Sequence, residues 1–228
     1  MLRNTVSFSL VCVLTFAGPA LADDDGAERL AKANSVFGEI MENREAGIPQ
    51  DLLAKAHCVG VIPGLKKGGF IVGGQFGRGY ILCRNGGGSA WTAPSAVLIE
   101  GGSFGLQIGG GEVDVVMLVM NEEGKRKLLE SEFKLGGEAG VMAGPVGRTA
   151  SAETDAYMHA EILSYSKSKG VFAGVALSGA TLREDKEANE KLYDQPLTSQ
   201  QILSGEVAPP EAAQPLIATL TQWSSQER

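Results

Sequence analysis

The sequence has few of the residues that build metal centres, phosphate loops or anion-binding surfaces. It has only two histidines, His57 and His159, and its three cysteines follow no recognised zinc spacing. No Gly-Lys-Ser or Gly-Lys-Thr phosphate loop is present. The net charge is −7, whereas a general electrostatic hold on nucleic acid needs surplus positive charge. We therefore expect no metal, no cofactor and no nucleic-acid partner.

Long apolar runs are confined to the start of the chain. In residues 1–22, Arg3 precedes an apolar run from Val6 to Phe16, and the segment ends in Ala20-Leu21-Ala22, as a secretory signal does. The run is shorter than the about 20 residues that cross a bilayer. We predict that 1–22 is a cleaved signal and that 23–228 is one exported domain, periplasmic or secreted.

Export would leave two cysteines, Cys58 and Cys83, in a compartment that permits disulfides. Whether the two pair stays open at this stage, because pairing requires their Cα atoms to lie close together.

The apolar period is helical at both ends of the chain and strand-like between them. Short β-type runs, each bounded by glycine or turn residues, fill the region from Cys58 onward. Val113 to Met120 is apolar at odd and even positions, which predicts a central strand covered on both faces. Helices are predicted over Ala27–Glu42, Glu122–Glu130, Lys186–Tyr193, Ser199–Leu203 and a last stretch whose Leu216, Ile217, Leu220 and Trp223 share one face. The predicted fold is α+β: a glycine-rich, mainly antiparallel curved sheet or barrel-like core flanked by N- and C-terminal helices.

Glycine is concentrated inside the predicted sheet. Of the 31 glycines, 23 lie between Gly60 and Gly147, interleaved with large apolar residues that a flexible linker lacks. Glycine in strands permits strong twist, bulges and close backbone approach. Two interpretations follow: a tightly curled barrel with helices pressed on it, or a ligand or lipid headgroup that lies against bare backbone amides.

Five ordered blocks carry a family resemblance. They are "KAHCVGVIPGLKKGGFIVGGQFGRG", "WTAPSAVLIEGGSFGLQIGGGEVDVVMLVMN", "LGGEAGVMAGPVGR", "SYSKSKGVFAGVALSGATLREDKEANEKLY" and "ILSG". In order and spacing the chain resembles the SYLF domain family over about residues 30–205, with a C-terminal helical tail beyond. The resemblance implies a non-enzymatic, lipid-binding domain that recognises acidic phospholipid headgroups, here as a secreted bacterial single-domain member of the cell envelope.

The resemblance also raises actin as a candidate partner, because some fungal members of the family bind and bundle it. An exported bacterial chain does not meet actin in its own compartment, so we do not expect actin as a partner. The predicted mature chain begins Asp23-Asp24-Asp25, with only Arg29 and Lys32 as nearby cations. This acidic start differs from the amphipathic, membrane-engaging N-terminus of eukaryotic members, because it would repel an anionic bilayer.

Cations and aromatic residues lie within and beside the glycine-rich stretch of residues 68–88. The predicted headgroup-binding residues are Lys66, Lys67, Arg78 and Arg84, since cations beside open amides suit a phosphate group. The predicted apolar contacts are Phe70, Phe76, Tyr80 and Trp91. The alternative interpretation is that the cations are ordinary solvated charges and the aromatics are core residues.

Two other function classes remain open. A protein interaction or scaffold module of the envelope would use the sheet edge or the last helix around Trp223. A serine hydrolase would use Ser103, which sits in a Gly-x-Ser-x-Gly pattern, with Asp114 or Asp155 and then His159 in the hydrolase order. That pattern requires a helix after the serine, but the following residues are strand-like. Glu112 and Asp114, on one face of a strand, could serve as paired carboxylates or as a solvated edge. We expect no enzyme.

Overall fold

The computed structural model describes residues 26–43, 47–69, 72–85, 88, 90–104, 109–130, 132–136, 140–146, 157, 160–168, 171–174, 177 and 179–225. The predicted signal, Phe70, Asp155 and His159 lie outside these ranges. Among the described helices none is long and apolar enough to span a membrane.

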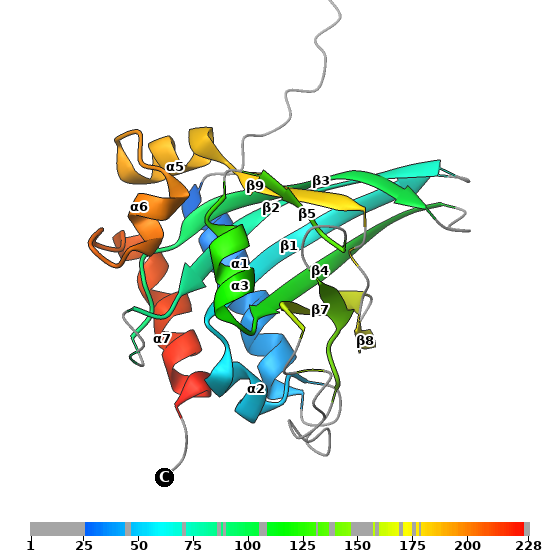
Figure 1. Ribbon diagram of the computed structural model, residues 1–228, viewed down its shortest axis with the longest axis horizontal. Coiled ribbons are helices and arrows are strands. Elements are labelled where there is room, and N and C mark those ends of the chain that lie inside the picture. Colours follow the sequence, from blue (N-terminus) through cyan, green and yellow to red (C-terminus); the bar gives the residue numbers. More distant parts are fainter. Residues whose placement is uncertain are drawn as a thin grey trace, which may run out of the picture.

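Helices occupy both ends of the described chain and strands occupy the middle (Figure 1). The helices are α1 (Gly26–Glu42), α2 (Gln50–Lys55), α3 (Glu122–Leu128), α5 (Lys186–Tyr193), α6 (Ser199–Leu203) and α7 (Gln214–Ser224), with a 3-10 turn η1 (Glu211–Ala213) before α7. The strands are β1 (Cys58–Gly69), β2 (Val72–Cys83), β3 (Ser95–Phe104), β4 (Gly109–Val119), β5 (Glu132–Lys134), β6 (Val141–Ala143), β7 (Ile162–Ser168), β8 (Val171–Gly174) and β9 (Ala180–Glu184).

All described strands join one curled sheet in the order β5-β9-β3-β2-β1-β4-β7-β6, with β8 on β7. Every pairing is antiparallel except that of β6 with β7. The four long strands stand in the order β3-β2-β1-β4, so β4 returns to pair with β1 as in a Greek key. The predicted α+β fold with a mainly antiparallel curved sheet is therefore confirmed.

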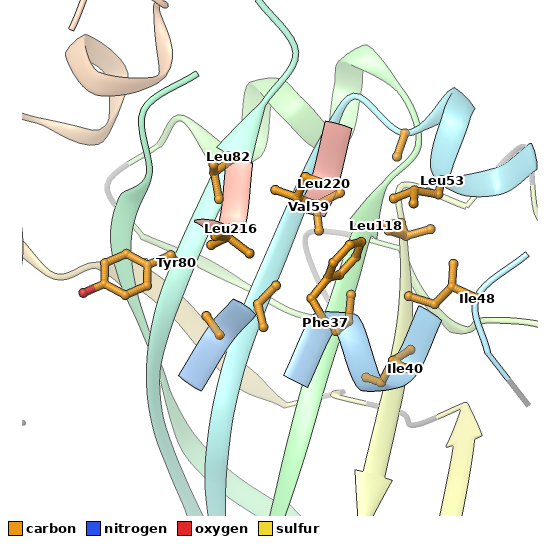
Figure 2. Close-up of a cluster of buried hydrophobic side chains, with 14 of the residues drawn as sticks. Phe37, Ile40, Ile48, Leu53, Val59, Tyr80, Leu82, Leu118, Leu216 and Leu220 are labelled. Carbon is orange, nitrogen blue, oxygen red and sulfur yellow. The ribbon is translucent and has the colours of Figure 1, made fainter. Parts of the chain in front are cut away.

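One face of the sheet packs against α1, α2 and α7 (Figure 2). Phe37 and Ile40 of α1 and Leu216 of α7 meet Val59 of β1 and Leu118 of β4 in one buried cluster. The helices cover only one end of the long strands, whose other ends run on past them (Figure 1). The covered end of the sheet is thus fixed, and the free end presents bare strand surface.

The opposite face of the sheet has its own buried cluster. Val115 and Met117 of β4 and Ile99 of β3 pack there with Phe133 of β5 and Leu203 of α6. Because neighbouring residues of β4 bury in different clusters, the prediction of a central strand covered on both faces is confirmed.

Two glycines of β2 allow close packing against β1. A side-chain Cβ at Gly79 would lie 2.1 Å from the carbonyl oxygen of Val61, and one at Gly77 would lie 2.8 Å from the side chain of Leu65. β1 therefore approaches these two positions of β2 at a distance that only glycine allows, next to the bulge between Val61 and Lys66. At Gly74 a Cβ would meet nothing within 4 Å, so tight packing explains only some of these glycines.

Two local outcomes go beyond the sequence prediction. Cys58 and Cys83 stand opposite each other in β1 and β2 and form a disulfide, which settles the open pairing. β8 and β9 follow each other in the chain, but they do not pair with each other. β8 pairs with β7, and β9 pairs with β3 and β5.

Candidate functional site

A cleft of about 450 Å³ lies where the start of α1 meets α5. Its walls are the first turn of α1, Arg78 of β2, one side of α5, and the chain before α7 at Pro210 and Ala212. Figure 1 shows α5 beside the start of α1, at the covered end of the sheet. Segments far apart in the sequence therefore form one concavity.

Three cationic side chains line this cleft, together with one carboxylate. The cations are Arg29, Arg78 and Lys191, and the carboxylate is Glu187. Arg29 is only 6% exposed, although it is an arginine. A concave site with several cations suits an anion that carries more than one oxygen, and arginine offers bidentate hydrogen bonds to phosphate.

Arg78 is held in place by the start of α5. Its Nε lies 3.1 Å from Oδ2 of Asp185, a residue that is 4% exposed. The other oxygen of Asp185 accepts a hydrogen bond of 3.2 Å from the backbone N–H of Ala188 and so caps α5. One buried carboxylate therefore orients Arg78 and fixes the first turn of the helix that carries Lys191.

The start of α1 is anchored just as firmly. The hydroxyl of Tyr80, a fully buried residue, donates a hydrogen bond of 2.9 Å to the carbonyl oxygen of Gly26. The N-terminal end of a helix carries partial positive charge. α1 thus adds to the positive potential of the cleft at a fixed position.

The four predicted headgroup residues do not meet at one place. Only Arg78 lines the cleft. Lys66 and Lys67 are neighbours in β1 beyond the helices, so their side chains point to opposite faces of the sheet. Lys66 is exposed and stands opposite Phe76 and Glu112, whereas Lys67 stands opposite Gln75. Burial lowers the pKa of Lys67.

Arg84 stabilises the other end of β2. Its guanidinium donates to the carbonyl oxygens of Ala56 (3.1 Å), Ala54 (3.2 Å) and Leu53 (3.4 Å), which end α2. Its Cζ also lies 4.6 Å from the centre of the Trp91 ring. Burial lowers the pKa of Arg84. This arginine is therefore engaged by the end of α2 and by Trp91.

The predicted apolar contacts lie in different surroundings. Phe76 is 46% exposed on the free end of the sheet. Tyr80 is fully buried, and Trp91 is buried with its ring N–H donating to the hydroxyl of Ser224 at 3.2 Å. Phe76 and Tyr80 lie four residues apart in β2 and so share a face of that strand. Of the described aromatics in that set, Phe76 alone presents a large apolar surface.

The residues considered for catalysis or metal binding lie in a strand or contact neighbouring residues of the fold. Ser103 lies within β3 and pairs with Gly73, so the first four residues of its motif, 101–104, are part of a strand. Asp114 accepts a hydrogen bond of 2.9 Å from the backbone N–H of Gly64 in the bulge, and His57 lies 2.9 Å from Glu122. The described residues hold no group of three or more potential metal ligands.

Arg29, Lys191 and Asp185 were not predicted as site residues. The sequence carried a signal for Arg29, because this residue lies beside Leu30 on the apolar side of the predicted helix. A cation is unexpected there and so indicates a specific role. Lys191 carried none, since a lysine at a helical spacing from Glu187 is an ordinary surface pair.

Comparison with known proteins identifies the class. Residues 100–223 match the Ysc84 family model, described as "Las17-binding protein actin regulator". The chain is 40% identical over 192 residues to Protein YSC84 of Saccharomyces cerevisiae, which covers 83% of this chain and 40% of the yeast protein. It is 33% identical over 201 residues to SH3 domain-containing YSC84-like protein 1 of Mus musculus, covering 87% of this chain and 58% of the mouse protein.

The chain therefore belongs to the Ysc84 family, whose shared domain is the SYLF domain. It spans about 40% of the length of its yeast relatives. The family description and the names of these relatives describe binding proteins and regulators rather than enzymes.

Proposed function

We propose that this protein is a non-enzymatic phospholipid-binding domain of the cell envelope, and that its cationic cleft holds an acidic headgroup. One observation carries the proposal: Arg29, Arg78 and Lys191 line a single cleft of about 450 Å³ in a protein whose net charge is −7. Local cations in an acidic protein bind a compact anion without a general affinity for polyanions. The prediction of export after cleavage of 1–22, with 23–228 as one domain, remains part of this proposal.

The free end of the sheet supplies a second element of the proposal. Phe76 and Lys66 stand opposite each other there, beyond the part of the sheet that the helices cover. An exposed aromatic ring beside a cation suits the interface of an anionic bilayer, where apolar and charged groups are both accommodated. The predicted roles of Lys66, Lys67 and Phe76 are kept as contacts outside the cleft.

Vesicle co-sedimentation tests the cleft. Arg78→Gln should be combined with Asp185→Asn, because removing Arg78 alone would leave a buried carboxylate without its partner. Asn caps helices as well as Asp does. With Lys191→Gln added, this variant should bind vesicles of phosphatidylcholine and phosphatidylglycerol at least about tenfold more weakly than the wild type, because charge-assisted hydrogen bonds are lost.

A matched control neutralises an ion pair and a lysine elsewhere. Arg126→Gln and Glu123→Gln remove the exposed pair on α3, whose nitrogen and oxygen lie 2.6 Å apart, and Lys134→Gln removes an exposed lysine of β5. This control should bind as the wild type does. Equal binding by the cleft variant and the wild type refutes the cleft as the headgroup site. A loss seen only in a Lys66→Ala, Lys67→Ala variant moves the site to the hairpin.

A protein-binding role is the second candidate, favoured by the relatives themselves. Two yeast relatives are named LAS seventeen-binding protein 3 and Protein YSC84, and the family description names an actin regulator. The predicted export argues against actin as the physiological partner. Co-sedimentation with filamentous actin decides whether the domain retains that surface: pelleting with actin, in the absence of any vesicle binding, favours the protein-binding role.

A further inference from the structure

A second cleft, of about 240 Å³, lies where the end of α2 meets the first turn of α3. We call it the α2 cleft. Its lining includes Lys55 and Ala56 at the end of α2, His57 and Arg84 at the ends of β1 and β2, and Glu122 and Lys125 of α3. It shares no lining residue with the cleft between α1 and α5, so it is a separate site.

Cations outnumber carboxylates in the α2 cleft. Lys55, Arg84 and Lys125 line it, and of its described lining residues only Glu122 is acidic. Oε1 of Glu122 lies 2.9 Å from Nδ1 of His57, so this carboxylate already has a partner in the cleft wall. In a protein whose net charge is −7, the α2 cleft is therefore a local positive site.

The two lysines of the α2 cleft differ from other lysines of the protein. Within the part of the chain that the structure describes, no ion pair engages the ammonium group of Lys55 or that of Lys125. By contrast, Lys32, Lys127 and Lys191 each have a glutamate oxygen within 3.1 Å. The ammonium donors of Lys55 and Lys125 are thus available to an external anion.

Arg84 prepares the α2 cleft for negative charge. The last carbonyl oxygens of a helix carry partial negative charge, which would repel an anion. Arg84 donates to the carbonyl oxygens of Ala56 at 3.1 Å and of Ala54 at 3.2 Å, and its positive charge offsets theirs. Since arginine stays protonated in proteins, a fixed positive charge stands behind the two lysines.

We propose that the α2 cleft binds a compact phosphate-type oxyanion, with Lys55 and Lys125 as its donors and Arg84 as a fixed charge. Sites for drug-sized ligands measure about 300–1,000 Å³, so a cleft of about 240 Å³ suits a single phosphate group rather than a larger molecule. That group could be inorganic phosphate or the terminal phosphate of a phosphomonoester lipid. The inference goes beyond the proposed function and does not depend on it.

Titration of the full chain with inorganic phosphate tests this proposal. In nuclear magnetic resonance spectra, the backbone amide signals of Ala56, His57 and Lys125 should shift and saturate. Lys55→Gln combined with Lys125→Gln should raise the Kd for phosphate at least about tenfold, because charge-assisted hydrogen bonds are lost. An unchanged Kd in this lysine variant overturns the proposal.

A matched control removes two lysines elsewhere. Lys32 of α1 and Lys134 of β5 are exposed and do not line the α2 cleft. Lys32→Gln combined with Lys134→Gln should leave the Kd for phosphate as in the wild type. An equal loss in both double variants, or shifts that do not saturate in the wild type, shows a general attraction of charge and overturns the proposal.

Vesicles of phosphatidylcholine and phosphatidic acid distinguish the two sources of phosphate. Weaker vesicle binding by the lysine variant than by its control assigns the α2 cleft to a lipid phosphate. Unchanged vesicle binding, together with lost binding of inorganic phosphate, assigns it to a soluble phosphate; both results support the site.

Failure of the proposed lipid function would be seen separately. The variant with Arg78→Gln, Asp185→Asn and Lys191→Gln should keep the phosphate-dependent shifts of Ala56 and Lys125, because those substitutions lie outside the α2 cleft. Loss of these shifts in that variant overturns the proposal. Saturable phosphate binding by a wild type that binds no vesicle supports the α2 cleft and refutes the lipid function.

Discussion

Replacement of Gly79 by alanine should destabilise the fold far more than the same replacement at Gly74, in the same strand. At Gly79 the new methyl group would lie 2.1 Å from the carbonyl oxygen of Val61 and 2.7 Å from the side chain of Ile62. At Gly74 it would meet nothing within 4 Å. Neither glycine has a positive φ, so alanine is compatible with both backbone conformations.

The expected free energies follow from these distances. Overpacking costs about 1–3 kcal/mol, and the upper end applies at Gly79 because the obstacle is backbone. Alanine also removes the conformational freedom of an unfolded glycine, which is worth about 0.5–1 kcal/mol in either variant. Gly79→Ala should therefore lose about 2–2.5 kcal/mol, and Gly74→Ala should gain about 0.5–1 kcal/mol.

Thermal and urea unfolding followed by circular dichroism measure the difference. For a domain of this size each kcal/mol shifts Tm by about 2–4 °C, so the Tm of Gly79→Ala should fall by about 4–10 °C and that of Gly74→Ala should rise by about 1–4 °C. Equal Tm values for the two variants would refute the close approach of β1 to Gly79 of β2. A change in the urea m-value would show that the substitution altered more than this local contact.

Three further outcomes test other contacts. Arg84→Gln should lower the free energy of unfolding by about 2 kcal/mol, because the carbonyls that end α2 and the ring of Trp91 lose a charged partner. Urea titration measures this loss, and an unchanged midpoint would refute a stabilising role for these contacts. Reduction of the Cys58–Cys83 bond, or Cys58→Ala with Cys83→Ala, should cost about 3 kcal/mol, since the bond closes a loop with a sequence separation of 25; a Tm that is insensitive to reductant contradicts this. Burial raises the pKa of Tyr165 and Tyr193, so their contribution to folding stability is complete below the ordinary tyrosine pKa of about 10 and is lost as pH rises through the raised values. The Tm should therefore fall steeply above about pH 10, and Tyr165→Phe should reduce that fall. If Tm falls with pH equally in the wild type and in Tyr165→Phe, Tyr165 does not cause the loss of stability.

The helices were predictable because their signals are local. Lys186–Tyr193 and Ser199–Leu203 were predicted with the observed boundaries. Asp185 caps the first, and Thr198 with Gln201 forms a capping box at the second. Such signals need only a few neighbouring residues, so they survive without knowledge of the fold.

Strand partners and the cleft were less accessible from the sequence. Alternation tells which face a side chain takes, but it does not tell that β4 pairs with β1 rather than β3. Arg78 was selected for its place beside glycines, whereas the structure puts it with Arg29 and Lys191. These residues meet only because α1, β2 and α5 pack together, and no local pattern encodes that meeting.

The packing of α7 against α1 determines when the helix layer of the fold can form. Leu216 and Leu220 of the last helix complete the layer that begins with Phe37 of the first helix. A growing polypeptide cannot complete this layer until α7 has been made. The layer that covers this face of the sheet therefore closes late, after every strand that it packs against has been synthesised.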